Sequence, residues 1–480
     1  MKNIIKYSLI FLVGFCLLTF NACKDVTDLN IDPNNPTDVL AENLLTQAQF
    51  ELADRMWSRN YNGEWTMLLT QHWSQNEYCE ESRYEVDGNT FDALWVDIYA
   101  NVLKELQNAG ELVSANAELG AAIKANQLAI LSTLEVYSYH LLVDGFGDIP
   151  YSQALDIDQY PNPSYDDQQS IYTGLVETLK SAIASMDTGA SSFDSGDVIY
   201  SGDVASWKAF ANSLLLRIAM RMSEVDEATA TAVINGISGD FISDNDQNAL
   251  FRFQENPDIA NPLYVDNVIG NRDDFCVSDV LINALVDRND PRLTAYAAPT
   301  NSGTYAGIPP GLPDADAFAL KSTTSRPSAR VRSATEPAIF MDHAEVQFLL
   351  AEAYERGILS GDAAAAYDAG VTASMEYWGF SDLSGAITDY LAANPYDSGD
   401  WKAVLGMQKW LAFYTNGPQA WAEWRRLGEP QLAVPAAAVN PVIPVRLPYP
   451  ISEETRNGTS LGEVTTNPND LSARLWWDMD

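Results

Sequence analysis

Histidine and cysteine are scarce in this 480-residue chain, which has three histidines and four cysteines. His72, His140 and His343 lie outside any HExxH pattern, and the sequence contains neither a GxSxG nor a P-loop motif. We interpret each histidine as a packed or surface residue. Cys79 and Cys276 form no CxxC or zinc spacing; they could pair, but two buried, reduced thiols are the favoured state. This scarcity argues against a metal site, a cofactor and the familiar hydrolase or nucleotide-binding motifs.

Basic residues are also few, because 28 Lys and Arg face 66 Asp and Glu, for a net charge of −38. Such a field repels phosphate backbones, which argues against nucleic acid as a partner. The acidic residues are spread along the chain, so we interpret them as a solvated surface. Their abundance does not indicate a glycosidase, since a catalytic carboxyl pair is defined by its separation in space. We expect no enzymatic activity.

Long apolar runs are nearly absent, and no stretch beyond the N-terminus reaches the length of a membrane span. The run from Tyr7 to Phe20 follows Lys2 and Lys6 and is typical of a secretory signal peptide. It leads into Ala22-Cys23, which resembles a lipoprotein signal-peptidase site. We therefore expect residues 1–22 to be a lipoprotein signal peptide, and Cys23 to carry acyl chains such as palmitate that anchor the protein in the membrane. An ordinary cleaved signal peptide and a permanent anchor helix are the alternatives.

Residues 23–40 are polar and rich in turn-forming residues, so we predict that they form a tether. Within this segment, Asp28, Asn30 and Asp32 imitate the start of a calcium-binding loop. However, Pro33 stands where such a loop needs glycine, and the position that needs glutamate is also occupied by another residue. Asx turns are therefore the preferred interpretation.

Helical periodicity is abundant. Ile171, Leu175, Leu179 and Ile183 recur on one helical face, and Asp167 is available as the N-cap. Long period-2 alternation is missing, so the predicted class is mainly α. We expect helices at 91–106, 121–143, 171–186, 205–223, 346–353, 363–376 and 402–425, separated by long loops at 187–204, 238–275, 297–339 and 428–475. Loops of this length are often functional.

Aromatic residues crowd residues 57–99, and the segment 72–89 mixes them with polar side chains. Sugar rings have apolar C–H faces that dock on aromatic rings, while amide, carboxylate and guanidinium groups bind the hydroxyls. The candidate ligand-binding residues in this segment are Trp73, Asn76, Tyr78 and Tyr84. Core packing is the alternative, because a fold of this size must bury many aromatic side chains.

Two later loops supply further candidates for ligand binding. Tyr264 and Arg272 belong to the loop 261–275, and Tyr296 and Tyr305 follow the Asn289-Asp-Pro-Arg292 turn. Other aromatic residues are assigned to packing: Trp95 and Tyr99, spaced i,i+4 on an expected helix, and the cluster of Trp421, Trp424, Arg425 and Arg426.

A series of short motifs runs in order along the chain. They are Gly147-Asp-Ile-Pro-Tyr151, Trp207-Lys-Ala-Phe-Ala-Asn-Ser-Leu214 with Arg217, Asn289-Asp-Pro-Arg292, Ala344-Glu-Val-Gln-Phe-Leu-Leu-Ala-Glu-Ala353 and Trp421-Ala-Glu-Trp-Arg-Arg426. Each motif is weak alone, but the ordered series resembles the SusD/RagB family of nutrient-binding outer-membrane lipoproteins. It looks most like the branch described as starch-binding and associating with the outer membrane.

The resemblance implies a mainly α SusD-like fold, in which tetratricopeptide-like helix pairs carry long irregular loops and residues 41–480 form one domain. It also implies a SusC-like TonB-dependent transporter as partner, with this chain as its lid and the oligosaccharide-capturing subunit at the cell surface. The motifs themselves look like helix-packing features, which say little about the ligand. Peptide capture, as in RagB, and a lid with negligible ligand binding of its own are the alternatives.

Overall fold

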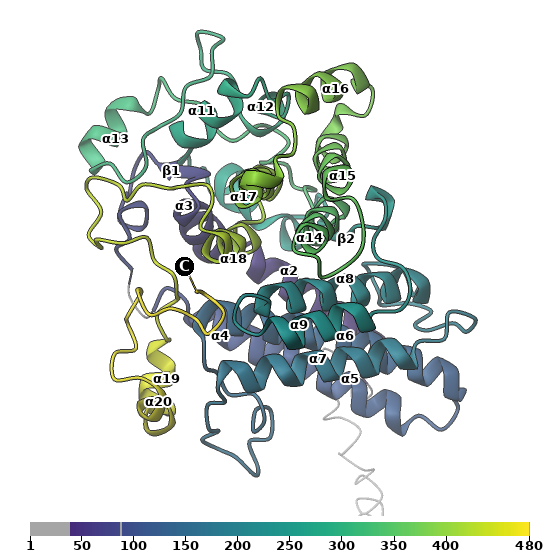
Figure 1. Ribbon diagram of the computed structural model, residues 1–480. Helices are drawn as coiled ribbons and strands as arrows, with labels where there is room; N and C mark the ends of the chain where they lie inside the picture. Colours follow the sequence, from purple (N-terminus) through teal and green to yellow (C-terminus); the bar gives the residue numbers. More distant parts are fainter. Residues whose placement is uncertain (1–38, 87–88, 480) are drawn as a thin grey trace, which may run out of the picture. The chain divides into compact units, whose positions relative to one another are not determined.

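Helices make up most of the chain, and strands are few and short (Figure 1). The structure is a computed structural model that describes residues 39–86 and 89–479. The longer helices are α2 (Ala41–Met56), α5 (Lys104–Ala115), α6 (Ala121–Phe146), α7 (Gln168–Ser185), α8 (Val204–Met222), α9 (Glu227–Gly236), α11 (Asp279–Asp287), α14 (His343–Glu355), α15 (Ala363–Met375), α16 (Ser384–Ala393), α17 (Trp401–Ala412) and α18 (Gly417–Leu427). The predicted mainly α class is confirmed.

The remaining elements are short. The α-helical ones are α3 (Met67–Leu69), α4 (Asp92–Asp97), α10 (Pro262–Tyr264), α12 (Leu293–Tyr296), α13 (Asp314–Leu320), α19 (Ile451–Arg456) and α20 (Gly458–Val464). The π-helical and 3₁₀ turns are η2 (Arg59–Thr66), η3 (Glu81–Arg83), η4 (Ile98–Leu103), η5 (Asn245–Gln247), η6 (Pro257–Ile259), η7 (Val265–Ile269), η8 (Glu376–Phe380) and η9 (Ser398–Asp400). The strands are β1 (Trp73–Gln75), β2 (Ala249–Phe251), β3 (Phe275–Val277) and β4 (Ala338–Met341).

Aspartate caps begin many of the helices. The Asp167 side chain accepts a hydrogen bond from the Ser170 backbone N–H at the start of α7, and Asp203 accepts one from Ser206 at the start of α8. Such caps satisfy backbone N–H groups that have no partner within the helix. Part of the acidic composition therefore has a local structural purpose.

The predicted helix at 402–425 is wrong in one respect, because the structure divides it into α17 and α18. Thr415, between them, has a left-handed φ of 72°, and Pro418 lies in the first turn of α18. A left-handed residue cannot continue a right-handed helix, and proline favours the first turn of a new one.

Consecutive helices pack as antiparallel-type pairs, as the tetratricopeptide-like fold requires. Contacts join α5 to α6, α6 to α7, α7 to α8 and α8 to α9, and a second group joins α14 to α15 and α17 to α18. The two groups meet where α14 contacts α8 (Figure 1).

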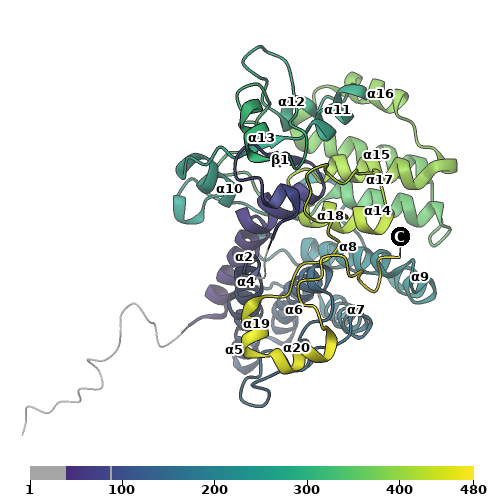
Figure 2. The same ribbon diagram turned by 90° about the vertical axis from the view of Figure 1, so that its left-hand side faces the viewer.

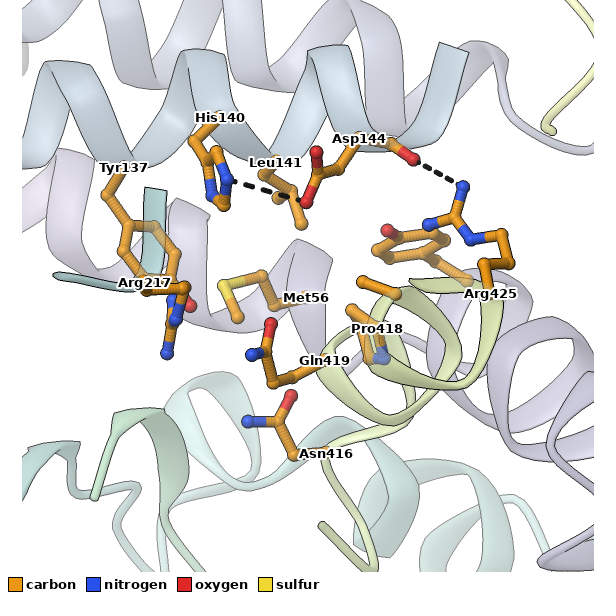
Figure 3. Close-up of a pocket in the computed structure, with 12 residues that line it drawn as sticks. Met56, Tyr137, His140, Leu141, Asp144, Arg217, Asn416, Pro418, Gln419 and Arg425 are labelled. Carbon is orange, nitrogen blue, oxygen red and sulfur yellow. Dashed lines mark hydrogen bonds and ion pairs between the residues drawn. The ribbon is translucent and has the colours of Figure 1, made fainter. Parts of the chain in front are cut away.

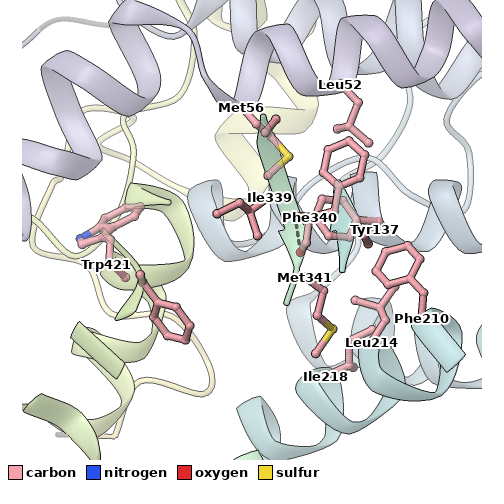
Figure 4. Close-up of a cluster of buried hydrophobic side chains, with 14 of the residues drawn as sticks. Leu52, Met56, Tyr137, Phe210, Leu214, Ile218, Ile339, Phe340, Met341 and Trp421 are labelled. Atoms are coloured by element: carbon pink, nitrogen blue, oxygen red, sulfur yellow. Dashed lines mark hydrogen bonds between the residues drawn. The ribbon is translucent and has the colours of Figure 1, made fainter. Parts of the chain in front are cut away.

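A buried apolar cluster fills the junction between these helix groups (Figure 4). Met56 comes from α2, Tyr137 from α6, Leu214 from α8, Phe340 from β4 and Trp421 from α18, and all are at most 5% exposed. The Tyr137 hydroxyl donates a hydrogen bond of 3.2 Å to the Phe340 carbonyl. Segments distant in sequence therefore share one core.

Two small antiparallel sheets connect the loops to the helices. β1 pairs with β3, with Trp73 opposite Val277 and Gln75 opposite Phe275, and β2 pairs with β4 across a bulge. The β1–β3 pair matters for function because it brings the loop after residue 75 beside the loop before residue 275. Figures 1 and 2 show α13 near this pair.

Contacts group residues 41–480 into one compact unit. The predicted signal peptide, lipidated Cys23, most of the tether and the segment of Asp28, Asn30 and Asp32 lie outside the described residues, and they stay predictions. Among the helices described, none combines the length and apolar character that a membrane crossing requires.

Candidate ligand-binding surface

Several charged residues of the sequence motifs are buried in ion pairs. Arg217 binds Glu345 at 2.6 Å, and Arg292 binds Asp290 at 2.6 Å, with all four side chains at most 4% exposed. Arg426, wholly buried, contacts Glu352. The motifs therefore join α8 to α14 and α14 to α18, and the assignment of Arg425 and Arg426 to packing is confirmed by their burial.

Two of the three histidines are also interior residues. Nε2 of His72 donates to the Trp410 carbonyl at 2.9 Å, and burial lowers the pKa of His72 to about 3. Burial likewise lowers the pKa of His140 to about 4, although Asp144 opposes the shift. Both imidazoles are neutral at physiological pH, in agreement with the prediction that they are packed residues.

His140 borders a small internal cavity between α6, α8 and α18 (Figure 3). Asp144, Arg217, Gln419 and Arg425 are among its other lining residues, and its volume is about 30 Å³. A space of this size holds a water molecule and excludes a sugar ring. This cavity is therefore unsuited to nutrient binding.

Four of the eight predicted ligand-binding residues are interior. Trp73 is 1% exposed and its Nε1 donates to the Tyr414 hydroxyl at 2.9 Å, while Tyr84 is also 1% exposed. Tyr296 is fully buried against Tyr414, with ring centroids 4.2 Å apart. Asn76 is buried, and its amide donates to the Asp273 carbonyl at 2.9 Å. These four side chains are packed in the interior and offer no ring or amide to solvent.

Tyr78 and Arg272 lie at the surface and meet there. Tyr78 is 59% exposed, and the Arg272 guanidinium carbon lies 4.9 Å from its ring centroid. This is a cation–π contact. Tyr78 has a left-handed φ of 54°, which directs the residue out of the line of β1. Sequence reasoning placed the two residues in separate candidate segments, and the β1–β3 pairing brings them together.

A chain of ion pairs holds Arg272 in position. Asp274, 3% exposed, accepts hydrogen bonds from Nε of Arg272 at 2.9 Å and from Nη2 of Arg59 at 2.8 Å. Arg59 also pairs with Glu64 and Asp266. Burial raises the pKa of Glu64 to about 7, although Arg59 lowers it. Arg59 was not among the sequence candidates, since an arginine in a helical segment carries no signal of such a role.

The loop that carries Tyr78 is fixed on its other side by α13. Glu77 pairs with Lys321 at 2.8 Å, and the backbone N–H of Cys79 donates to Asp314 at 2.8 Å. Phe318 on the same helix is 59% exposed and was missed by sequence reasoning. Tyr264, the last residue of α10, and Tyr305, in the loop after α12, are half-buried. We call the exposed group of Tyr78, Arg272 and Phe318 the loop surface.

Cys79 and Cys276 are both buried and unpaired in the structure, which confirms the favoured thiol state. They share a small apolar cluster with Ile308 and Ala317. Burial raises the pKa of Cys79 to about 12. In the described part of the chain, no group of three or more His, Cys, Asp and Glu residues is arranged to hold a metal ion.

Among the hollows of ligand size that open elsewhere on the surface, two border loops. One, of about 490 Å³, lies between the end of α2, residues 90–94 and the segment 257–270. The other, of about 440 Å³, lies between α4, the loop 150–163 and α19, and exposed Ile157 is at its edge. Both fall within the usual size range of ligand pockets, roughly 300–1,000 Å³.

Comparison with known proteins gives a consistent assignment. The family model described as "Starch-binding associating with outer membrane" matches residues 33–450. A solved chitin-binding protein is 28% identical with a TM-score of 0.82, and the match covers 92% of this chain and 100% of that one. A SusD homologue from Bacteroides fragilis is 25% identical with a TM-score of 0.76, covering 92% and 99%.

A chitin-binding SusD homologue from Flavobacterium johnsoniae is 22% identical with a TM-score of 0.78, covering 92% and 99% of the two chains, and shows the shared fold. No curated protein gives a significant match.

Proposed function

Because the chain belongs to the SusD-like family, we propose that it is a cell-surface lipoprotein of the outer membrane that captures oligosaccharides for uptake and catalyses no reaction. The family description, starch-binding and associating with the outer membrane, supports the general role. The 28% identical chitin-binding protein makes chitin-type oligosaccharides the first ligands to test.

The exposed Tyr78–Arg272 pair is the observation that carries this proposal. An aromatic ring that is 59% exposed gives the C–H face of a sugar an apolar platform. The guanidinium beside it has donors for hydroxyl or acetamido oxygens. Since Asp274 fixes Arg272 before any ligand arrives, little conformational entropy is lost on binding.

The remaining features of the proposal are the anchor and the partner. The apolar run before Cys23 supports a lipid anchor on that thiol. Family membership supports a SusC-like TonB-dependent transporter as partner, with this chain as a lid over the barrel. Cross-linking the tagged full-length chain in its native membrane tests the partnership, and recovery without any barrel protein would contradict it.

Calorimetric titration of the soluble chain from Asp25 to Asp480 tests ligand capture directly. We expect binding to one class among chitin, starch and other oligosaccharides, and loss of at least about tenfold in affinity for Tyr78→Ala. Ile157→Ala removes an even more exposed side chain, at the edge of the hollow beside α19, and is the control that should bind as wild type. Equal affinities for all three proteins would contradict the role of Tyr78.

Peptide capture is the second candidate function, and the net charge of −38 favours cationic peptides. A peptide digest that binds while every sugar fails would establish it. If neither sugars nor peptides give a binding signal, the result would support a lid that binds ligand only together with its transporter.

A further inference from the structure

We infer that the hollow of about 490 Å³ beside Arg59 is a second subsite, which binds an uncharged or amine-bearing sugar unit of the oligosaccharide held at Tyr78 and Arg272. We call it the Arg59 hollow. It is lined by residues between Asp54 and Tyr61, between Thr90 and Leu94, and between Pro257 and Gly270. The inference rests on the proposed function and adds to it the extent and the charge preference of the site.

The Arg59 hollow combines an apolar floor with a polar rim. Phe91, Leu94 and Ala260 are at most 5% exposed and line the hollow from the core side. Asn60 and Asp258 are exposed at its edge. Saccharide sites need this combination, because a sugar unit has apolar C–H faces and a periphery of hydroxyl groups.

Several rim side chains have unused hydrogen-bonding capacity. Within residues 39–86 and 89–479, the side chains of Asn60, Thr90 and Asp258 make no hydrogen bond or ion pair with the protein. Together they present amide, hydroxyl and carboxylate groups, which donate to and accept from hydroxyls. The nearby Ser58 hydroxyl is already engaged, as it accepts from the Tyr61 backbone N–H at 3.3 Å.

Arg59 connects this hollow to the loop surface. Its guanidinium belongs to the wall of the hollow and donates to Asp274 at 2.8 Å, and the same Asp274 oxygen accepts from Arg272 at 2.9 Å. One carboxylate therefore separates the wall of the hollow from the arginine that lies over Tyr78. An oligosaccharide of several units is long enough to occupy both the hollow and the loop surface.

The charges around the hollow select the kind of sugar. Its two arginines are already paired, Arg55 with Asp54 and Asp97, and Arg59 with Glu64, Asp266 and Asp274. Carboxylates thus outnumber arginines, and Asp258 adds an unpaired one. Uronic acids and sulfated sugars are negatively charged, so the carboxylates would repel them and no unpaired arginine among the described residues of the hollow would attract them. Neutral or amine-bearing units are therefore favoured.

Filling the hollow from its rim provides the test. Ala93 is exposed on α4 and lines the hollow, so Ala93→Trp blocks it without entering the core. Ala100 is exposed on η4 and lines the other hollow, so Ala100→Trp is the matched control. Calorimetry would compare both variants and wild type against a chitin-type series from disaccharide to hexasaccharide, or against the series that wild type binds best.

We expect Ala93→Trp to lose about tenfold in affinity for the hexasaccharide and little for the disaccharide, with Ala100→Trp unchanged. Asn60→Ala, which leaves the hollow open, should show a smaller loss with the same length dependence. An oligosaccharide in which uronic acid replaces neutral units should bind wild type more weakly.

Two results would overturn the inference. If Ala93→Trp and wild type bind every length equally while Tyr78→Ala abolishes binding, the proposed function stands and the second subsite falls. A selective loss in Ala100→Trp would instead assign the second subsite to the hollow beside α19. If wild type binds no oligosaccharide and Tyr78→Ala behaves identically, the proposed function itself fails.

Discussion

Arg426 lies entirely inside the protein and binds two carboxylates. Its Nη2 is 2.7 Å from Glu423 and also contacts Glu352, and Lys409 binds the same two groups at 2.7 and 3.0 Å. Burial alone would raise the pKa of Glu352, but Arg426 and Lys409 lower it below its ordinary value. These residues form a satisfied buried network, in which the loss of any member leaves uncompensated charge.

We expect Arg426→Met to lower the free energy of unfolding by about 3–5 kcal/mol, because the buried carboxylates of Glu352 and Glu423 each lose an ion-pair partner. Arg456 is exposed on α19 and makes no ion pair with the described residues, so Arg456→Met should change stability by less than about 0.5 kcal/mol. Urea unfolding followed by circular dichroism measures both. Similar losses in the two variants would contradict the importance of the network.

His72 predicts a specific pH dependence. Its pKa is about 3 in the folded protein and 6.5 in an exposed histidine, so between these values the unfolded chain binds a proton and the folded chain does not. Stability attributable to His72 is therefore present above pH 6.5 and is lost as the pH falls towards 3. His72→Gln removes this titration.

The stability advantage of wild type over His72→Gln should shrink as the pH falls below 6.5, by up to about 1.4 kcal/mol per pH unit. Other titrating groups are common to both proteins and cancel in the difference. Thermal or urea unfolding at several pH values gives this difference, and a constant gap from pH 7 to pH 5 would refute the assignment.

At the scale of elements, single side chains fix long loops. Asp197 organises the loop between α7 and α8: one oxygen accepts from Ile199 N–H at 3.0 Å, and the other accepts from Gly202 N–H and Trp207 Nε1, both at 2.7 Å. The first oxygen also accepts from Gln49 of α2 at 3.2 Å. The loop is therefore attached to two helices through one buried carboxylate.

Asp197→Ala should destabilise the protein by about 3 kcal/mol, since several buried donors lose their acceptor at once. Asp203→Ala removes the exposed N-cap of α8 six residues further along the chain and should cost about 1 kcal/mol. Chemical denaturation distinguishes the two values, and an equal effect would mean that Asp197 is only a local cap.

The helices were predictable because their signals are local. The expectation at 121–143 corresponds to α6, which continues to Phe146, and 205–223 corresponds to α8 within one residue at each end. The division between α17 and α18 was missed because the left-handed Thr415 has no sequence signature, although Pro418 was a signal that could have been used.

The candidate site was predictable only in part, since the fate of an aromatic residue depends on tertiary packing. Tyr78 and Tyr84 belong to one polar segment and both have left-handed φ values, of 54° and 65°. The first is 59% exposed and the second 1%. Composition and spacing do not distinguish them, and only the tertiary packing around each ring decides which one reaches solvent.

At the scale of the whole molecule, the net charge of −38 means that like charges repel across the surface. Salt screens this repulsion, with a Debye length of about 10 Å at 0.1 M, whereas the buried ion pairs are screened much less. The melting temperature should therefore rise from low to physiological ionic strength. A melting temperature that falls on adding sodium chloride would mean that surface ion pairs outweigh the repulsion.

The two buried thiols provide a way to measure the rate of local unfolding. Cys79 and Cys276 are fully buried, and burial raises the pKa of both thiols, so neither is a reactive nucleophile while the fold is closed. An alkylating reagent reaches them only when the β1–β3 region opens. The rate at which the mass of the protein increases then measures how often the region beneath Tyr78 and Arg272 unfolds locally. Because both native thiols are unreactive, a fluorophore would attach preferentially to a cysteine introduced on the loop surface. The rates of ligand binding and of local opening could then be measured separately in one protein.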